Sequence, residues 1–328
     1  MLFRPKNILY ILLFTFSFSQ ISYSQENEFR VGRLSEGIRV YVDQNLKMGF
    51  MDQYYNKLTG PIFDYPSSMV YDIPFFSEGL CVFYEKQASE EVKIYKEDER
   101  YKYGFINKNF QVVITAKFPL YNFYCDNTPP YFSAERAIVN SPYKNDYEQD
   151  NGFILIDKKG KQLGKEFDYS IGVTAACIHF PEITENLIAY QGEKGYGYLD
   201  ASTGLSSISA SFSNAGPFSE GLALVEVDGK YLTIIDRSGK PVISQKFYIV
   251  KNGSKSPSLY SNYFGDARLN GFIYGELLIQ YFDQGGTGEH VHALIDKTGK
   301  IIKKKSEKSI HNQIDFERYS WISKNKFY

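Results

Sequence analysis

A four-residue phrase, Ser-Glu-Gly followed by Ile or Leu, recurs along this chain of 328 residues. Each copy opens an apolar run that reads as a β-strand. Self-similarity of this kind is the signature of a repeat architecture, in which one small unit is used many times. The copies occupy residues 35–38, 77–80 and 219–222.

A second motif ends in an acid or amide, which we call the anchor, preceded each time by two apolar residues. In three units the anchor begins an Asp-x-x-Gly turn that closes on Gly160, Gly239 or Gly299. Asp first and Gly fourth favour a type I turn whose Asp side chain caps backbone amides. The anchors are Asp52, Asn107, Asp157, Asp200, Asp236 and Asp296.

Each anchor is followed by an apolar strand, and in five units by a Phe at a nearly fixed distance. The shortest spacing, from Asp200 to Asp236, is 36 residues, which three short strands with their turns fill. Longer spacings indicate insertions in loops, mainly at 86–101, 141–150, 251–270 and 283–290. The five Phe are Phe63, Phe118, Phe167, Phe212 and Phe247.

These patterns predict an all-β protein of about six irregular repeats, each a small antiparallel sheet of about three strands. We expect a propeller-like ring, because closure protects sheet edges; an open β-solenoid is the alternative. Phe63, Phe118, Phe212 and Phe247 are predicted to pack between neighbouring units. The apolar positions predicted to be buried are Leu80, Ile106, Leu199, Leu222, Ile235 and Ile295.

The pattern resembles the WG-repeat (KWG) family, whose units read roughly F-S-E-G-L-A-x-V, then K-W-G-Y-I-D-x-x-G, then V-I and F. The match is best over residues 217–247, and the whole resemblance spans roughly 29–304. The signature Trp is replaced in every copy. The resemblance implies an exported or cytosolic repeat array with no shared catalytic residue. The residues at the Trp position are Met48, Tyr103, Phe153, Tyr196, Leu232 and His292.

The beginning of the chain has the features of a secretory signal peptide. Arg4 and Lys6 precede an apolar stretch over 8–18, and small residues flank Tyr23 just before Gln25. We therefore predict a cleaved signal peptide at 1–24, a repeat array at 25–310 and a C-terminal strand or cap at 311–328. Export to the periplasm or the cell exterior follows, with no transmembrane segment in the mature chain.

Composition excludes some classes of protein. A formal net charge of −1 argues against a general nucleic-acid binder, which would need a basic face. The cysteines Cys81, Cys125 and Cys177 allow at most one disulfide within the chain. Cys81, inside an apolar run, is predicted to be buried as a small apolar side chain.

The recurring acids predict architecture rather than catalysis, because a catalytic carboxylate pair is normally unique to one place. We expect Glu36, Glu78 and Glu220 to cap or brace the strand entry and the anchor Asp residues to cap turns. His290 and His292, two apart on a predicted strand, are a weak candidate for a metal site. No catalytic residue and no cofactor is predicted.

The sequence therefore favours an exported, non-catalytic binding or scaffold protein whose repeats contact a protein or glycan of the cell envelope. The alternative is an envelope hydrolase with a site built from the loop insertions. Tyr residues in the insertions suit a binding surface, because they combine a rigid apolar ring with a polar tip. The candidates are Tyr95, Tyr101, Tyr143, Tyr147, Tyr260 and Tyr263.

Overall fold

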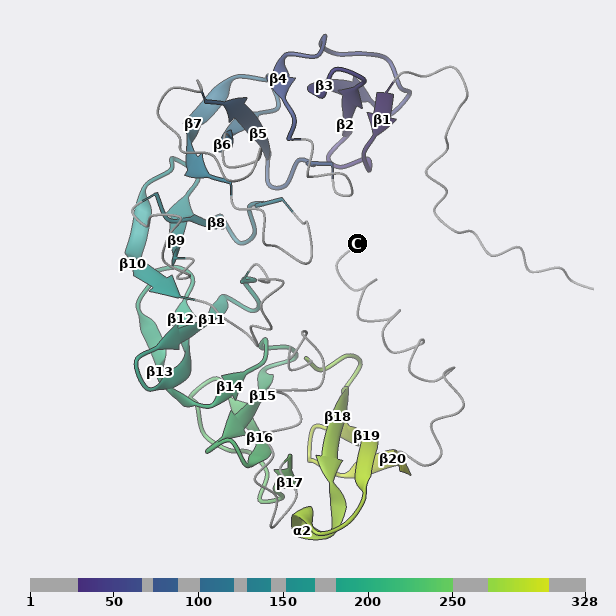
Figure 1. The fold of residues 1–328 in the computed structure, drawn as a ribbon, viewed down its shortest axis with the longest axis vertical. Coiled ribbons are helices and arrows are strands. Elements are labelled where there is room, and N and C mark those ends of the chain that lie inside the picture. The colour runs from purple at the N-terminus through teal and green to yellow at the C-terminus, as the bar shows by residue number, and fades with distance from the viewer. Residues whose placement is uncertain are drawn as a thin grey trace, which may run out of the picture.

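The computed structural model describes seven segments of the chain (Figure 1). The predicted signal peptide, the predicted cap, Cys125 and Cys177 lie outside them. The described segments are 29–66, 73–87, 101–120, 129–142, 152–168, 181–249 and 271–306.

The described strands form six units, and each anchor is the last residue of the middle strand of its unit. The units are β2–β4, β5–β7, β8–β10, β11–β13, β15–β17 and β18–β20, with short β1 and β14 added before the first and the fifth. The first three units contain β1 (Phe29–Val31), β2 (Ile38–Asp43), β3 (Lys47–Asp52), β4 (Phe63–Asp64), β5 (Leu80–Lys86), β6 (Tyr101–Asn107), β7 (Val112–Pro119), β8 (Arg136–Asn140), β9 (Gly152–Asp157) and β10 (Gln162–Asp168). The last three contain β11 (Leu187–Gly192), β12 (Gly195–Asp200), β13 (Ser206–Phe212), β14 (Asn214–Ala215), β15 (Leu222–Val227), β16 (Tyr231–Asp236), β17 (Phe247–Tyr248), β18 (Glu276–Phe282), β19 (His290–Asp296) and β20 (Ile301–Ser306).

All pairings among the described strands are antiparallel, and neighbours in the sheets are neighbours in the chain. Units join two by two into sheets of seven, six and seven strands. Within each sheet the two units are linked by a single residue pair: Asp64 with Tyr84, Asp168 with Gln191, and Tyr248 with Phe282. In the described part of the chain, helix is limited to α2 (Asp283–Gly286).

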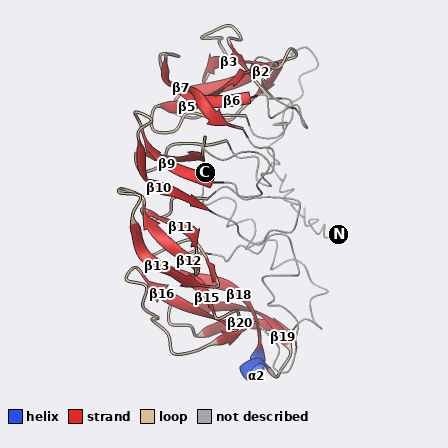
Figure 2. Cartoon of the chain, turned by 60° about the vertical axis from the view of Figure 1, so that its left-hand side comes forward, coloured by secondary structure: helices blue, strands red, loops and turns tan. Residues whose placement is uncertain are grey.

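The units follow one another along a curved arc, with β1 at one end and β20 at the other (Figures 1 and 2). No pairing among the described strands joins the first sheet to the last. The predicted all-β repeat fold of small antiparallel sheets in a propeller-like order is confirmed. The described strands form an open arc rather than a closed ring.

The core is continuous from unit to unit because the middle strands are buried on both faces. On β9, Ile154 and Ile156 pack into a cluster with units 1 and 2, whereas Phe153 and Leu155 pack into a cluster with units 4 and 5. Successive residues of a strand point to opposite faces, so one strand serves two clusters. This explains why the middle strands are apolar throughout instead of alternating.

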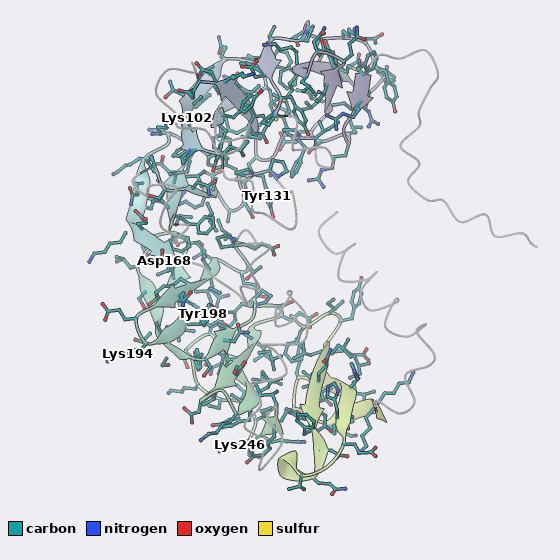
Figure 3. The ribbon with its side chains drawn as sticks, viewed as in Figure 1. Lys102, Tyr131, Asp168, Lys194, Tyr198 and Lys246 are labelled. Atoms are coloured by element: carbon teal, nitrogen blue, oxygen red, sulfur yellow. The ribbon has the colours of Figure 1, made fainter. Side chains whose placement is uncertain are left out.

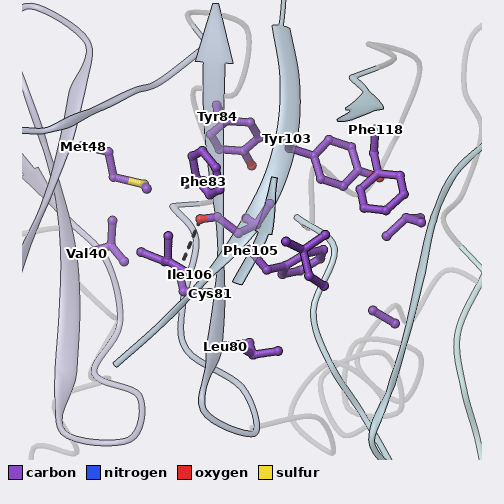
Figure 4. Close-up of a cluster of buried hydrophobic side chains, with 14 of the residues drawn as sticks. Val40, Met48, Leu80, Cys81, Phe83, Tyr84, Tyr103, Phe105, Ile106 and Phe118 are labelled. Carbon is purple, nitrogen blue, oxygen red and sulfur yellow. Dashed lines mark hydrogen bonds between the residues drawn. The ribbon is translucent and has the colours of Figure 1, made fainter. Parts of the chain in front are cut away.

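The predicted core residues are buried with a few exceptions. Leu80, Ile106, Leu199, Ile235 and Ile295 are buried, and the cluster that contains Ile106 is drawn in Figure 4. The prediction was wrong for Leu222, which is only partly buried. Phe63 and Phe212 are partly buried and pack against the core clusters.

Cys81 is 1% exposed, as predicted, and it carries a free thiol. Burial raises the pKa of that thiol far above its ordinary value. The side chain therefore behaves as a small apolar residue in the core of the first two units.

Two glycines let the third strand of a unit cross directly over the middle strand. A Cβ added to Gly104 would lie 2.2 Å from the carbonyl oxygen of Ile114, and one added to Gly197 would lie 2.5 Å from that of Ile208. Both pairings shift register at this point. Glycine is required here by space, since any side chain would strike backbone.

Candidate functional site

The Ser-Glu-Gly phrase forms a turn in which two consecutive residues have positive φ, as in the two-residue turns of hairpins. Glu36 and Gly37 have φ of 50° and 85°, and Ser35 and Ile38 bond each other's backbone. In the described residues the same turn occurs six times, once before each unit. Three copies were missed in the sequence because their residues differ: 133–136 (Ser-Ala-Glu-Arg), 184–187 (Thr-Glu-Asn-Leu) and 273–276 (Ile-Tyr-Gly-Glu).

The turn glutamates join one unit to the next. The Glu36 carboxylate accepts the backbone N–H of Gly79, at 3.1 Å from Oε2. The amide that donates is always that of the third residue in the next unit's four-residue turn, 36 to 57 residues later. The other pairs are Glu78 with the Glu135 amide at 2.8 Å, Glu185 with the Gly221 amide at 3.1 Å, and Glu220 with the Gly275 amide at 2.9 Å.

A cation from the next unit completes each of these junctions. It is always the residue directly after the anchor, so it lies on the turn that leaves the middle strand. We call the glutamate, the amide and the cation together the clamp. The ion pairs are Lys108 with Glu36 at 3.2 Å, Lys158 with Glu78 at 3.5 Å, Arg237 with Glu185 at 3.3 Å, and Lys297 with Glu220 at 3.0 Å.

A serine hydroxyl forms a further bond between units. Ser35 Oγ donates to the carbonyl of Phe76 at 2.6 Å, a Phe that directly precedes the next unit's turn. The two equivalent bonds, Ser77 to Phe132 and Ser219 to Phe272, have the same length of 2.6 Å. The Ser and the Glu of the phrase are thus both used in stacking the units.

The anchor side chains bind the turn that follows them. Asp157 Oδ1 accepts the amides of Lys159 and Lys161, both at 2.9 Å, and Gly160 supplies the left-handed residue at φ 75°. Hydrogen bonds, led by the Ser238 hydroxyl, lower the pKa of Asp236, and the Thr298 hydroxyl does the same for Asp296. Gly239 and Gly299 take the position of Gly160, at φ 80° and 79°.

The anchors Asp52 and Asp200 have the same arrangement with local differences. The Asn56 side chain lowers the pKa of Asp52. For Asp200, burial alone would raise the pKa, but hydrogen bonds from Ser202 and Thr203 outweigh it and lower the pKa. In these four anchors the ionised carboxylate is the form that the turn stabilises.

His290 and His292 lie side by side on β19. Their ring centroids are 5.0 Å apart, and the His290 ring also lies 5.6 Å from that of Phe282. In the part of the chain that the structure describes, no group of three or more His, Cys, Asp or Glu is placed to hold a metal ion. The pair therefore has no third protein ligand of these types among the described residues.

Of the six candidate tyrosines, only Tyr101 lies within the described residues. The expectation that Tyr101 belongs to a loop was wrong: it is the first residue of β6, is 7% exposed and pairs with Lys86. The strand begins earlier than expected because the antiparallel pairing of β6 with β5 continues as far as this residue pair. Tyr95, Tyr143, Tyr147, Tyr260 and Tyr263 lie outside the described residues.

The strand boundaries locate the insertions in the unit. Residues 87–100 and 142–151 both separate the first strand of a unit from its middle strand, in units 2 and 3. Residues 250–270 instead follow a third strand. In unit 4 the first-to-middle connection is a tight turn, with Gly192 paired with Gly195. Its Lys194 lies at the outer edge of the arc, whereas Tyr198 lies inside it (Figure 3).

Exposed aromatic side chains occur at the two ends of the described array. Tyr54 and Tyr55, after the first anchor, are 74% and 58% exposed, and Tyr274, in the last turn, is 85% exposed. Their positions explain this exposure, since no further described unit stacks on either end. The sequence analysis did not identify these three tyrosines. For Tyr274 the sequence does offer a signal, because four other turns have Glu at this position.

The fold and the contacts between units define an all-β repeat protein built of stacked three-stranded units. The model of the WG containing repeat matches residues 103–124 and 196–231, so the predicted WG repeats are confirmed in these two segments. The matches begin at Tyr103-Gly104 and Tyr196-Gly197, where Tyr replaces Trp and the Gly lies under a crossing strand. Tyr103 is fully buried, and its hydroxyl donates to the Asn140 side chain of the next unit at 2.9 Å.

A search among curated proteins finds no match. Several solved structures resemble the chain weakly in shape. They include the computationally designed protein Ika8, with 12% identity over 85% of this chain and 87% of that chain and a TM-score of 0.37. BamB from Moraxella catarrhalis has 11% identity over 86% and 88%, at 0.36, and Hsv2 from Kluyveromyces lactis has 8% over 85% and 87%, at 0.37. At TM-scores this low we draw no conclusion from these likenesses.

Proposed function

We propose that this chain is an exported, non-catalytic binding or scaffold protein that uses its WG-repeat array to contact a protein or glycan of the cell envelope. The observation that supports this proposal is the contrast between stacking contacts that repeat and connections that vary. The clamp and the serine bond recur from unit to unit, whereas the first-to-middle connections range from a two-residue turn to the insertion at 87–100. Variable loops on a rigid repeat scaffold are the usual place of recognition.

The recurring carboxylates also favour binding over hydrolysis. A catalytic acid needs an environment of its own, with a raised pKa. The resolved shifts of the anchor Asp residues all go the other way, since their pKa values are lowered by turn hydrogen bonds. The turn glutamates are engaged by amides and cations of the next unit.

Export is part of the proposal and rests on the leader-like pattern at 1–24. In the part of the chain that the structure describes, no helix is long and apolar enough to cross a bilayer. Fractionation of cells that express the chain with a C-terminal tag tests this step. A product shortened by about 24 residues in the periplasm or medium supports export; a full-length product in the cytoplasm contradicts it.

The binding step is tested by shortening each insertion without disturbing its strands. Lys86 pairs with Tyr101 at the mouth of the first insertion, and Ser141 donates its amide to Gly152 at the mouth of the second. An Asn-Gly turn suits such closely spaced ends, so it replaces residues 87–100 in one variant and 142–151 in another. The matched control is Lys194→Ala in the tight turn of unit 4.

Capture from an envelope extract then decides the outcome. We expect the parent and the control to retain a partner that at least one shortened variant loses while keeping the parent's melting temperature. Treating the extract beforehand with protease or with glycosidases distinguishes a protein partner from a glycan. If both shortened variants capture everything that the parent captures, these insertions are not the binding surface.

A further inference from the structure

The junction between units 3 and 4 lacks the clamp. Ala134 stands where the turns of units 1, 2, 4 and 5 have Glu, and Ala201 follows the anchor where units 2, 3, 5 and 6 have Lys or Arg. Both partners are absent together at this one junction, although the clamp is present at the four others. The glutamate and the cation are therefore present together at four junctions and absent together at this one.

In the described part of the chain, two kinds of contact that occur at three of the four other junctions are also missing here. Among the described residues, no hydrogen bond runs from the Ser133 hydroxyl to the next unit, whereas Ser35, Ser77 and Ser219 each make one. Leu155 and Ile183, which belong to one apolar cluster, occupy the positions where three other junctions have two aromatic rings. Those ring pairs are Phe50 with Phe76 at 5.8 Å, Phe105 with Phe132 at 4.9 Å, and Tyr198 with Phe218 at 4.7 Å.

The turn that begins unit 4 forms side-chain hydrogen bonds within its own unit. Asn186 replaces the Gly whose amide usually meets the glutamate, and its side chain donates to Asp200 at 3.2 Å and to Ser202 at 2.9 Å. These bonds stabilise unit 4 alone. They do nothing to hold unit 4 against unit 3.

Among the described residues, the contacts across this junction include an apolar cluster, a strand pair and a close backbone contact. Phe153 and Leu187 share the cluster, and Asp168 pairs with Gln191. Gly164 and Gly204 meet backbone to backbone, so that a Cβ on Gly204 would lie 2.5 Å from the Leu163 carbonyl oxygen. Apolar contacts are non-directional, and glycine leaves the backbone free to change its angles.

We propose that this junction is the hinge of the array, which divides it into two halves of three units, residues 29–168 and 181–306. The stability of a repeat protein is close to a sum of unit terms and nearest-neighbour terms, so the array opens first where the neighbour term is smallest. Bending at this point changes the distance between loops on the two halves. The halves keep their internal curvature because their own junctions are clamped.

Hydrogen exchange followed by mass spectrometry, on the full mature chain in increasing urea, tests the division. We expect peptides from 29–168 to exchange as one cooperative group and peptides from 181–306 as another. Amides facing the junction, such as those of β10 and β11, should open before the global transition. A single cooperative group for all six units, or a boundary at a clamped junction, overturns the proposal.

A gain-of-contact variant sharpens the test. In Ala134→Glu the new carboxylate faces the Asn186 amide, and the φ of 51° at residue 134 already matches that of the native turn glutamates. We expect exchange of the junction amides to slow by about tenfold, as for one added hydrogen bond to a charged group. Ala134→Gln is the control, since it matches the size without the charge and should slow exchange less.

A second variant removes an existing clamp and tests the same point if Ala134→Glu folds poorly. Glu78→Ala removes the clamp between units 2 and 3 and leaves a turn like that of Ala134. A new boundary between these units is expected, with faster exchange of amides on β7 and β8. Unchanged exchange in both Ala134→Glu and Glu78→Ala would show that the clamp does not set where the array opens.

Discussion

The Oε2 atom of Glu36 lies 3.1 Å from the backbone nitrogen of Gly79, which is 43 residues further along the chain. This contact explains why the Ser-Glu-Gly phrase recurs. The Gly provides the left-handed turn, the Glu reaches the turn of the next unit, and the Ser bonds the Phe carbonyl before that turn. The phrase is therefore a connector between repeats as well as the start of one.

The two ends of the array follow the same logic. A glutamate in the last turn would have no next described unit to bind, and Tyr274 stands there instead. A cation after the first anchor would have no preceding glutamate, and Gln53 stands there. A ring closed through the same interface would need both groups, so the clamp pattern agrees with the open arc in Figure 1.

Removing one clamp should destabilise the protein measurably. Glu78 is about one-third exposed, so we discount the value of a charge-assisted bond for solvent screening and expect Glu78→Ala to cost about 1 kcal/mol. Glu78→Gln should cost less because it still accepts the Glu135 amide. Urea unfolding monitored by circular dichroism measures this, with the exposed Glu193→Ala as the control expected to change little. A Glu78→Ala midpoint equal to that of the control would contradict a stabilising clamp.

The Phe residues after the anchors should differ in their contribution according to burial. Phe118 is 1% exposed and packs on Tyr103 at 5.6 Å, so Phe118→Ala should cost about 3–5 kcal/mol. Phe212 is only partly buried, and Phe212→Ala should cost clearly less. Thermal or urea unfolding of the two variants compares them directly. Equal losses of stability in the two variants would show that the burial of Phe118 and Phe212 does not determine how much each contributes to stability.

The middle strands could be located from the sequence because each one ends in two apolar residues and an anchor. All six anchors end a middle strand, from β3 at Asp52 to β19 at Asp296. Three of the six turns were missed because Ala134, Asn186 and Tyr274 depart from the phrase. Their conformation is shared, but a left-handed residue other than Gly gives only a weak signal in sequence.

The contacts between units were beyond the reach of the sequence. The predicted role of the glutamates, to cap or brace the strand entry, was local, whereas Glu78 bonds the Glu135 amide 57 residues away. Which unit a side chain meets depends on the rotation between neighbours, and no local propensity encodes that rotation. The same limit applies to closure, since small angles add up along the array. For the candidate tyrosines, the burial of Tyr101 depends on where β6 begins, and strand ends are the least certain part of a prediction.

The anchor turns should make the protein sensitive to acid. The pKa values of Asp52, Asp236 and Asp296 are lowered in the folded state, so the unfolded chain binds protons at higher pH than the folded chain does. Their stabilising effect is complete above the unfolded pKa of about 3.9 and is lost as the pH falls through the folded values. Urea midpoints measured between pH 6 and pH 2 should therefore fall steeply below about pH 4.

Asp236→Asn is the matched variant for the acid effect. Asn107 shows that an amide fits this position, because its Oδ1 accepts the Asn109 amide at 2.9 Å and the Gln111 amide at 3.0 Å. The variant should fold and show a shallower fall in stability below pH 4. An unchanged slope would mean that the turn at Asp236 does not contribute to acid sensitivity.

Gly104 should tolerate no side chain, because the third strand of its unit crosses over it. The Cβ of Gly104→Ala would lie 2.2 Å from the Ile114 carbonyl oxygen, and this neighbour is backbone, so β7 must shift away from β6. We expect a loss of about 3 kcal/mol, at the upper end of overpacking effects. Gly60→Ala is the control, since a Cβ there meets nothing within 4 Å and should leave the urea midpoint within the range of surface substitutions. Gly197→Ala, with its Cβ 2.5 Å from the Ile208 carbonyl oxygen, should repeat the loss in unit 4. If both variants unfold at the same urea concentration as Gly60→Ala, the close crossing of strands at these two glycines is incorrect.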